Sequence, residues 1–513
     1  MREFLGCLIL VGLSCGCQND SSSPQQNGGR NKATGQVAET ETDLVEGWQA
    51  QASPDNGTDY RNPLIRGFGQ LANDTSIFQA DTGIGEMLAE ADAAISDIKD
   101  ENRAALRDLN RQVRIGQRPP NILVVLADDV GYGDLGCYGQ QKIKTPHLDA
   151  LAAGGARLTD FYAGAITDRS SRWCLMTGYD TSHVAQRTGD SFALRPRHVT
   201  LGETLWKAGY STAMVGYWGL GTEADSMPHL HGFDEWFGML GLGDDDYPEH
   251  LWSNGSRVRL VANENKQRGQ YLPDVLISEA ISVIKRRSPE RPFLLLASFN
   301  RPSDAPDVDR YAGKNWSKDA QAYAAALTRM DNDVGRLMHE IAQQGLKENT
   351  VILFLSDNGA QLDDGPGKAF FSSNGQLRGG KGSLYEGGLR VPAIINWPNR
   401  IRAGTVVSEP FAIWDILPTL ADIAGAWRQP LGMDGISMLP SLRGRAGAER
   451  EMLYWEVRRN GLGQAARMGK WKVVRPAGRD RLEDVELYDL SVDPGEANNI
   501  AAEFPQIVAK FIR

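Results

Sequence analysis

The chain has 513 residues, which is long enough for a large core and for more than one domain. Hydrophobic residues make up 41% of it and the formal net charge is −10, a composition typical of α/β proteins. The negative charge and the lack of a basic stripe argue against nucleic-acid binding, whereas an acidic chain suits a protein that holds a hard cation.

The first 17 residues have the pattern of a secretory signal peptide. Arg2 precedes the apolar run FLGCLILVGL, which is too short to cross a bilayer and is followed by small residues. Cys17, or alternatively Cys15, lies where a bacterial lipoprotein would be cleaved and lipidated, and a plain secretory signal is the other interpretation. We therefore expect an exported protein, in the periplasm or at the cell surface, with a lipid anchor as its membrane attachment.

Residues 18–60 are rich in Ser, Gln, Asn and Gly and predict a flexible tether. Residues 61–118 predict a helical N-terminal extension, because apolar residues recur at three- and four-residue spacing over 84–113. Two interpretations of this helix stay open. It packs on its own domain, or it is a coiled-coil element through which the protein self-associates.

Residues 119–400 alternate between apolar runs and amphipathic patterns, which predicts an α/β domain with a central sheet flanked by helices. The apolar runs predict buried strands over 121–129, 211–218, 292–299, 351–359 and 391–398. Helical periodicity predicts helices over 148–155, 199–209 and 320–345. Short strand-like segments after residue 400 predict a smaller C-terminal α+β subdomain, 401–513, with an antiparallel sheet.

Acidic pairs follow two of the apolar runs. Asp128 and Asp129 end the first, and Asp357 and Asn358 end the fourth. Ligands collect at the carboxyl ends of strands in an α/β sheet. Three carboxylates and one amide oxygen on adjacent strand ends therefore predict a hard-cation site, suited to Ca²⁺ or Mg²⁺.

The segments PNILVVLADDVGYGDLGCYG and KTPHLDALAAGGARLTDFYA resemble the opening of a sulfatase of the alkaline phosphatase superfamily. The resemblance continues through GYSTAMVGYWGLG, VILFLSDNGA and LRGGKGSLYEGGLRVPAIINWP and covers about residues 119–505. It implies a central mixed sheet flanked by helices, a sulfated substrate and a Ca²⁺ ion, with Mg²⁺ as the alternative.

The resemblance also implies a catalytic group that this chain lacks. Family members carry Cys or Ser in C/S-x-P-x-R, matured to formylglycine, whose hydrate attacks the sulfate sulfur. Arg172, Leu175 and Thr177 fix the register against that motif and place Asp168 at the formylglycine position and Ser170 at the proline position. Aspartate has neither a thiol nor a hydroxyl to oxidise, so no formylglycine is expected here.

Three further family positions differ. The Lys and His of the GKWHLG motif are Tyr217 and Gly219, and the His that would protonate the leaving group is Ser303. The resemblance retains Arg172 and Lys381 as substrate-binding residues, together with the four cation ligands at the strand ends.

Three functional interpretations follow. In the first, the protein binds Ca²⁺ with Asp168 as an extra ligand, lacks normal sulfatase turnover, and binds a sulfated glycan or sulfate ester. In the second, it is an active sulfuric or phosphoric ester hydrolase with a divergent mechanism, using Asp168 or a metal-bound water as nucleophile. In the third, it is a structural component of a surface assembly that makes contact through helix 84–113.

Overall fold

The structure is a computed structural model that describes residues 118–183, 192–241, 245–299, 308–361, 370–426, 430, 432–458, 461–479, 481 and 484–512. The predicted signal peptide, tether and helix 84–113 lie outside these residues, and so does Ser303. Among the described residues, no helix combines the length and the apolar character needed to cross a membrane.

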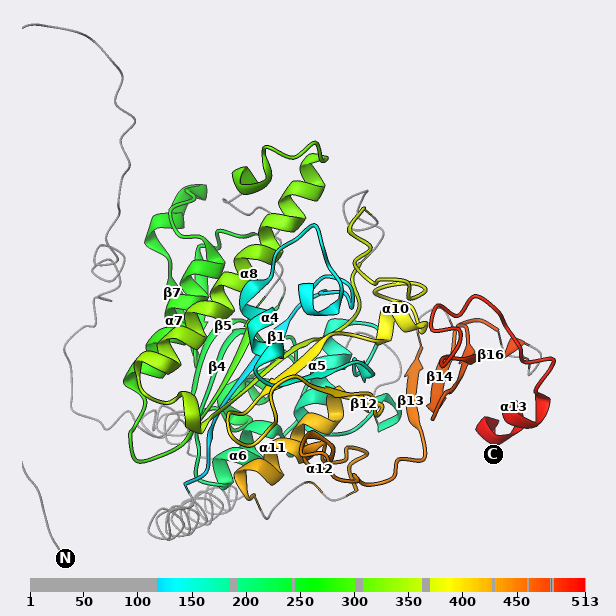
Figure 1. Ribbon diagram of the computed structural model, residues 1–513. Coiled ribbons are helices and arrows are strands. Elements are labelled where there is room, and N and C mark those ends of the chain that lie inside the picture. Colours follow the sequence, from blue (N-terminus) through cyan, green and yellow to red (C-terminus); the bar gives the residue numbers. More distant parts are fainter. Residues whose placement is uncertain are drawn as a thin grey trace, which may run out of the picture. The chain divides into compact units, whose positions relative to one another are not determined.

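A ten-stranded mixed sheet forms the centre of the molecule, in the order β11-β2-β10-β9-β1-β8-β4-β5-β6-β7 (Figure 1). Neighbours from β9 to β5 pair in parallel, and the β9–β10, β10–β2, β5–β6 and β6–β7 pairs are antiparallel. The strands are β1 (Asn121–Ala127), β2 (Ala156–Leu158), β4 (Ser211–Tyr217), β5 (Glu235–Met239), β6 (His250–Ser253), β7 (Ser256–Arg259), β8 (Phe293–Phe299), β9 (Thr350–Ser356), β10 (Ala393–Asn396) and β11 (Thr405–Val407). A small parallel pair joins β3 (Phe161–Tyr162) and β12 (Phe411–Ala412).

Both faces of the central strands are buried, which explains their continuous apolar sequences. In β1, Ile122, Val124 and Leu126 point into one hydrophobic cluster, and the alternate residues point into a second cluster on the other face. The predicted strands over residues 121–129, 211–218, 292–299, 351–359 and 391–398 are all present, each slightly shorter than its apolar run.

Helices cover each face of the sheet. Residues of α4 (Pro146–Ala153), α7 (Leu272–Arg286) and α8 (Lys318–Gln343) belong to one cluster, and residues of α5 (Asp168–Thr177), α6 (Leu201–Lys207) and α11 (Ile416–Ala424) belong to the other. The three predicted helices correspond to α4, α6 and α8, whereas α5, α7 and α11 were not predicted. Two single-turn helices, α10 (Glu386–Leu389) and α12 (Leu439–Leu442), lie in the connections.

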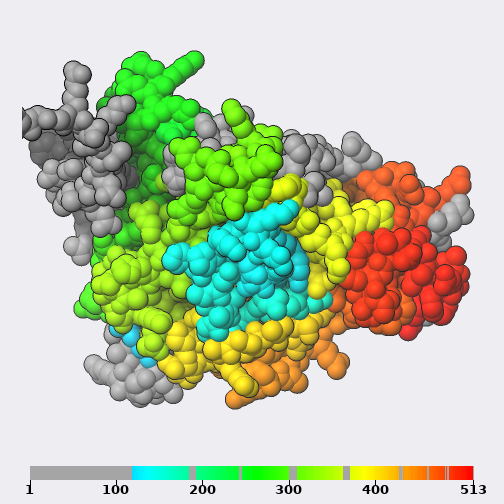
Figure 2. Space-filling view, turned by 45° about the horizontal axis from the view of Figure 1, so that its top comes forward, coloured from blue at the N-terminus to red at the C-terminus, as the bar shows by residue number. Residues whose placement is uncertain are grey.

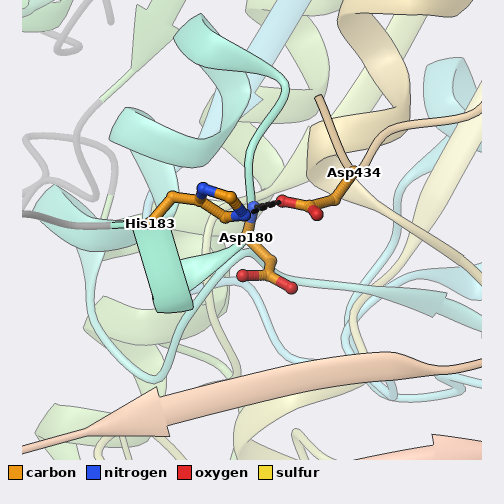
Figure 3. Close-up of side chains that lie close together, drawn as sticks. All are labelled: Asp180, His183 and Asp434. Atoms are coloured by element: carbon orange, nitrogen blue, oxygen red, sulfur yellow. Dashed lines mark hydrogen bonds and ion pairs between the residues drawn. The ribbon is translucent and has the colours of Figure 1, made fainter. Parts of the chain in front are cut away.

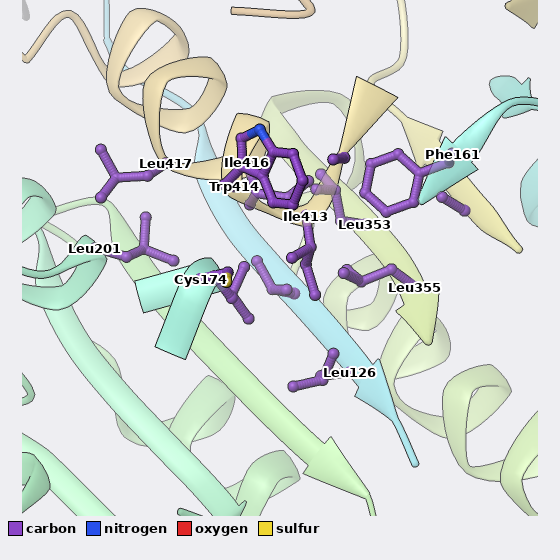
Figure 4. Close-up of a cluster of buried hydrophobic side chains, with 14 of the residues drawn as sticks. Leu126, Phe161, Cys174, Leu201, Leu353, Leu355, Ile413, Trp414, Ile416 and Leu417 are labelled. Atoms are coloured by element: carbon purple, nitrogen blue, oxygen red, sulfur yellow. The ribbon is translucent and has the colours of Figure 1, made fainter. Parts of the chain in front are cut away.

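Helix α5 is anchored by the hydrophobic cluster beneath it (Figure 4). Cys174 is fully buried among side chains from β1, β9, α6 and α11, including Leu126, Leu355, Leu201 and Leu417. The sheet and its helices therefore hold the first residue of α5, Asp168, at a fixed place in the fold.

A second sheet of four antiparallel strands follows in the chain (Figure 1). Its strands are β13 (Leu453–Val457), β14 (Gly463–Met468), β15 (Trp471–Arg475) and β16 (Glu486–Asp489), and α13 (Pro505–Ile512) packs on it. Figure 2 shows these C-terminal residues, orange to red, against the yellow segment that includes α10. The predicted fold class, a mixed sheet flanked by helices plus a smaller C-terminal part with an antiparallel sheet, is confirmed.

Candidate metal centre

The candidate site lies where the central parallel strands end. Asp128 and Asp129 follow β1, and Asp357 and Asn358 follow the adjacent strand β9. Each of the three carboxylates offers an oxygen that lies within 4.8 Å of the other two, and all three residues are buried. The structure thus brings together the four side chains that the sequence predicted as a cation site.

Two oxygens in this group have no hydrogen-bond partner. Asn358 Nδ2 donates to Asp129 Oδ1 at 2.7 Å, and the Asp129 backbone N–H donates to Asp357 Oδ1 at 3.3 Å. Asp128 Oδ1 and Asn358 Oδ1 are buried and unpaired. Unpaired buried oxygens are costly, and carboxylate and amide oxygens are the ligands that Ca²⁺ and Mg²⁺ prefer. The residues present therefore fit a hard divalent cation.

The raised pKa values of two of these carboxyl groups indicate that negative charges lie close together in a buried place. Burial, followed by the charge of Asp129, raises the pKa of Asp128 to about 6. Burial, followed by the charge of Asp128, raises the pKa of Asp357 well above its ordinary value. A bound divalent cation would relieve both effects, since it stabilises the ionised carboxylates.

Two cationic side chains border the carboxylates. Arg172, on α5, is almost completely buried, and its Nη2 lies 3.1 Å from Asp357 Oδ2. Lys381 Nζ lies 2.6 Å from Asp129 Oδ1. Burial alone would lower the pKa of Lys381, but the charges of Asp129 and Asp128 raise it overall. Both predicted substrate-binding residues therefore lie at the site, each already paired with a carboxylate.

Asp168 lies beside this group. It is the first residue of α5, where the helix dipole favours a negative charge. Its carboxylate is not one of the three that share the 4.8 Å cluster. Instead its Oδ2 accepts a hydrogen bond of 3.0 Å from the hydroxyl of Tyr217.

The sequence analysis missed two contacts at this edge of the sheet. Arg172 Nη1 donates to the hydroxyl of Ser298 on β8, and it also donates to the Tyr217 carbonyl at 3.0 Å. The signal for Ser298 was available, because the apolar run that contains it ends at the same sheet edge. The Tyr217–Asp168 contact had no such signal, since it depends on side-chain direction between positions 49 residues apart.

A second group of potential ligands lies after the C-terminus of α5 (Figure 3). Asp180, His183 and Asp434 also offer ligand atoms within 4.8 Å of one another. Contacts inside the group account for its geometry, because His183 Nε2 lies 3.3 Å from Asp434 Oδ2 and the Asp180 backbone N–H donates to the same oxygen at 3.0 Å. The group therefore joins the segment after α5 to the segment after α11 without needing an ion.

Comparison with known families agrees with this fold. The family model described as Sulfatase matches residues 120–426, and the model described as N-sulphoglucosamine sulphohydrolase, C-terminal, matches residues 380–511. The chain belongs to the sulfatase family, and the resemblance inferred from its sequence is confirmed.

Characterised relatives cover most of the chain. Mouse steryl-sulfatase is 30% identical, over 75% of this chain and 79% of its own length. Human arylsulfatase A is 33% identical, over 75% and 83% respectively. The N-acetylgalactosamine-6-O-sulfatase of Bacteroides thetaiotaomicron is 28% identical, over 76% and 91%. A crystal structure of Ps i-CgsB in complex with k-i-k-neocarrahexaose superposes with a TM-score of 0.68 and 28% identity, covering 77% of this chain and 91% of that one.

The raised pKa of Asp128 predicts a pH-dependent stability in the metal-free protein. The folded state keeps the Asp128 proton up to about pH 6, whereas the unfolded chain loses it near 3.8. The stability that the Asp128 proton contributes is therefore fully present below about pH 4, is lost as the pH rises to about 6, and does not change above that. Two pH units correspond to a loss of about 3 kcal/mol at most. Urea unfolding of metal-stripped protein from pH 4 to pH 7 measures this loss, and Asp128→Asn should make the profile less steep, with the raised pKa of Asp357 contributing the remaining slope. An unchanged slope in the variant would assign the dependence to other groups.

Proposed function

We propose that this sulfatase-family protein binds Ca²⁺ at the strand-end carboxylates and does not hydrolyse sulfate esters by the formylglycine route. The observation that supports this most directly is Asp168. It occupies the formylglycine position, begins α5, and accepts a hydrogen bond from a tyrosine that replaces the family lysine. An aspartate held in this way has no oxidisable group, so the nucleophile of the family reaction cannot form.

The cation part of the proposal rests on the buried oxygens. Asp128, Asp129, Asp357 and Asn358 would hold the ion. Asp168 lies outside that cluster but close enough for its charge to act on Asp128, and it would add a carboxylate beside the ion. Oxygen ligands suit Ca²⁺ and Mg²⁺ alike, and we favour Ca²⁺ because it tolerates irregular, higher-coordinate sites. When bound, the ion would supply positive charge that stabilises the ionised carboxylates around it.

The expected loss of turnover rests on several missing groups rather than on one. Tyr217 has no ammonium to bind sulfate, and Gly219 has no side chain to move a proton. General acid–base groups typically contribute about 10²–10⁴-fold each to enzyme rates. Because the nucleophile is absent as well, ester hydrolysis should fall to a level indistinguishable from background.

The ligand in this proposal is a sulfated glycan or sulfate ester, bound without hydrolysis. The similarity to Ps i-CgsB, whose crystal structure is in complex with k-i-k-neocarrahexaose, supports an oligosaccharide as the class of ligand. We further propose that the protein acts outside the cytoplasm, because its first 17 residues have the charge and hydropathy pattern of an export signal.

An activity screen tests the proposal. Purified protein is assayed with aryl sulfate, phosphate and phosphonate esters, once with Ca²⁺ and once with a chelator. We expect no turnover above that of the buffer in either condition. Turnover that depends on Ca²⁺ and disappears in Asp168→Ala would instead establish the divergent hydrolase, with Asp168 as a reacting group.

A further inference from the structure

Tyr217 occupies the space that a side chain at position 219 would need. Gly219 has a φ of +77°, and a Cβ built on it would lie 2.8 Å from both Cζ and Oη of Tyr217. Real Cβ atoms do not approach other atoms so closely, so either the ring moves or the position stays glycine. A side chain at 219 would therefore have to displace the Tyr217 ring, in addition to the strain of the positive φ.

The Tyr217 ring is held in place from several directions. Tyr217 is the last residue of β4 and is fully buried. Its hydroxyl donates to Asp168, and its ring centre lies 4.5 Å from the guanidinium carbon of Arg172. Burial raises the pKa of Tyr217 to about 12, and the Asp168 charge adds to the rise, so the hydroxyl remains a donor at neutral pH. The ring cannot easily give way to a larger residue at 219.

The carboxylates at this edge of the sheet offset most of its positive charge even when a cation is bound. Four carboxylates lie here, with the cationic side chains of Arg172 and Lys381, and Arg169 interacts with the Tyr217 hydroxyl; the carboxylates are Asp128, Asp129, Asp168 and Asp357. With four carboxylates and three cationic side chains, one divalent cation would bring the formal charge of this group to +1, against +2 without Asp168. A sulfate dianion would therefore find less positive charge than the site would offer without Asp168, and it would lie close to that carboxylate. Each close pair of like charges costs several kcal/mol at the effective dielectric constant of a partly buried site.

We infer that Tyr217 is a positioning residue that fixes the Asp168 carboxylate at the cation site, so that the chain's own carboxylate fills the place of an external sulfate group. This inference rests on the proposed function and deepens it. Asp168, Tyr217 and Gly219 form one interlocked unit, and sulfate is excluded from the inner position. A sulfated ligand would then contact the outer part of the site with its sugar.

Sulfate binding tests the positioning role. Inorganic sulfate is titrated calorimetrically into Ca²⁺-loaded protein. The wild type should bind it at least about tenfold more weakly than Asp168→Ala, since removal of one nearby charge is worth more than the 1.4 kcal/mol that a tenfold change requires. Tyr217→Phe keeps the ring but frees Asp168, and should give intermediate affinity. In the Asp168→Ala background, Tyr217→Phe should have no further effect.

The control for this titration is Asp225→Ala, which removes a half-exposed carboxylate that is paired with Arg195 and takes no part in the site. It should leave sulfate affinity at the wild-type level. If Asp168→Ala binds sulfate no better than the wild type, the inference is wrong. It is also wrong if Tyr217→Phe changes sulfate affinity equally with and without Asp168, because Tyr217 would then not act through that carboxylate.

A double-mutant cycle tests the interlock without any ion. Gly219→Ala is compared in the wild type and in Tyr217→Ala by urea unfolding in the presence of chelator. The strain of a side chain at a positive φ is the same with and without the Tyr217 ring, so it cancels in this comparison. We expect Gly219→Ala to lower the urea midpoint further in the wild type than in Tyr217→Ala, because the ring fills the space only in the wild type. Equal falls would overturn the interlock. Failure of the protein to bind Ca²⁺ would instead overturn the proposed function. The cycle would still show whether the Tyr217 ring fills the space that a side chain at 219 needs.

Discussion

Ca²⁺ is expected to raise the melting temperature of the purified protein, and Asp357→Asn is expected to abolish that rise. A ligand at 100 times its dissociation constant stabilises the folded state by about 2.7 kcal/mol, which corresponds to a shift on the order of 5 °C in a domain of this kind. Asp357 is the critical position because it is fully buried, lies in the carboxylate cluster, and bonds to Arg172. Its replacement by asparagine keeps the shape of the side chain and removes the charge.

The second ligand group supplies a matched control. Asp434→Asn removes a carboxylate from the group with Asp180 and His183, in which Asp434 contacts His183 and the Asp180 backbone while the Asp180 carboxylate accepts from Ser182. If the Ca²⁺ response originates at the strand ends, this variant retains the full shift in melting temperature. A response that survives in Asp357→Asn but is lost in Asp434→Asn would place the ion in the second group. No shift in the wild type would contradict Ca²⁺ binding altogether.

The proximity of the four strand-end side chains was predictable because the carboxyl ends of parallel strands lie at the same edge of a sheet. The apolar runs before Asp128 and Asp357 identified two buried strands, and the structure pairs them as direct neighbours, β1 and β9. The proximity of these side chains could be predicted without knowing the order of the other strands in the sheet. It was enough that two acidic pairs each followed a strand buried on both faces.

The coupling between Asp168 and Tyr217 was not predictable in the same way. The sequence comparison identified both as departures from a family motif, but treated them as separate losses. Only the direction of the two side chains shows that one binds the other, and only the backbone at Gly219 shows that no side chain fits beneath the ring. Helix α5 was also missed, because polar residues dominate its first turn and its apolar residues are few.

A buried lysine that the sequence analysis did not single out makes one of the contacts between the C-terminal sheet and the main domain. Lys472, on β15, is fully buried, and its Nζ lies 2.9 Å from a carboxylate oxygen of Glu386 and 2.9 Å from one of Glu496. Glu386 belongs to α10, so the contact joins the C-terminal sheet to the main domain. Burial alone would raise the pKa of Glu386, but Lys472 and two neighbouring arginines lower it overall.

Lys472→Met is therefore expected to reduce the free energy of unfolding by about 3–5 kcal/mol, the usual cost of removing one partner from a buried ion pair. The methionine replaces the volume of the lysine stem but leaves two buried carboxylates facing each other. The matched control is Lys470→Met in the turn before β15. Its Nζ lies 2.6 Å from Asp489 with half of the side chain exposed, so its loss should cost about 1 kcal/mol or less. Urea unfolding of both variants measures the difference.

Neutralising the two carboxylates separates charge from packing. If unpaired charge is the cause of the loss, Lys472→Met combined with Glu386→Gln and Glu496→Gln recovers a large part of the stability, because buried neutral groups cost less than buried charges. Recovery will be incomplete, since Glu386 also accepts a hydrogen bond from Tyr162 and pairs with Arg390. A triple variant no more stable than Lys472→Met would show that the lysine acts through packing. An equal loss in Lys470→Met would show that burial of the pair contributes nothing.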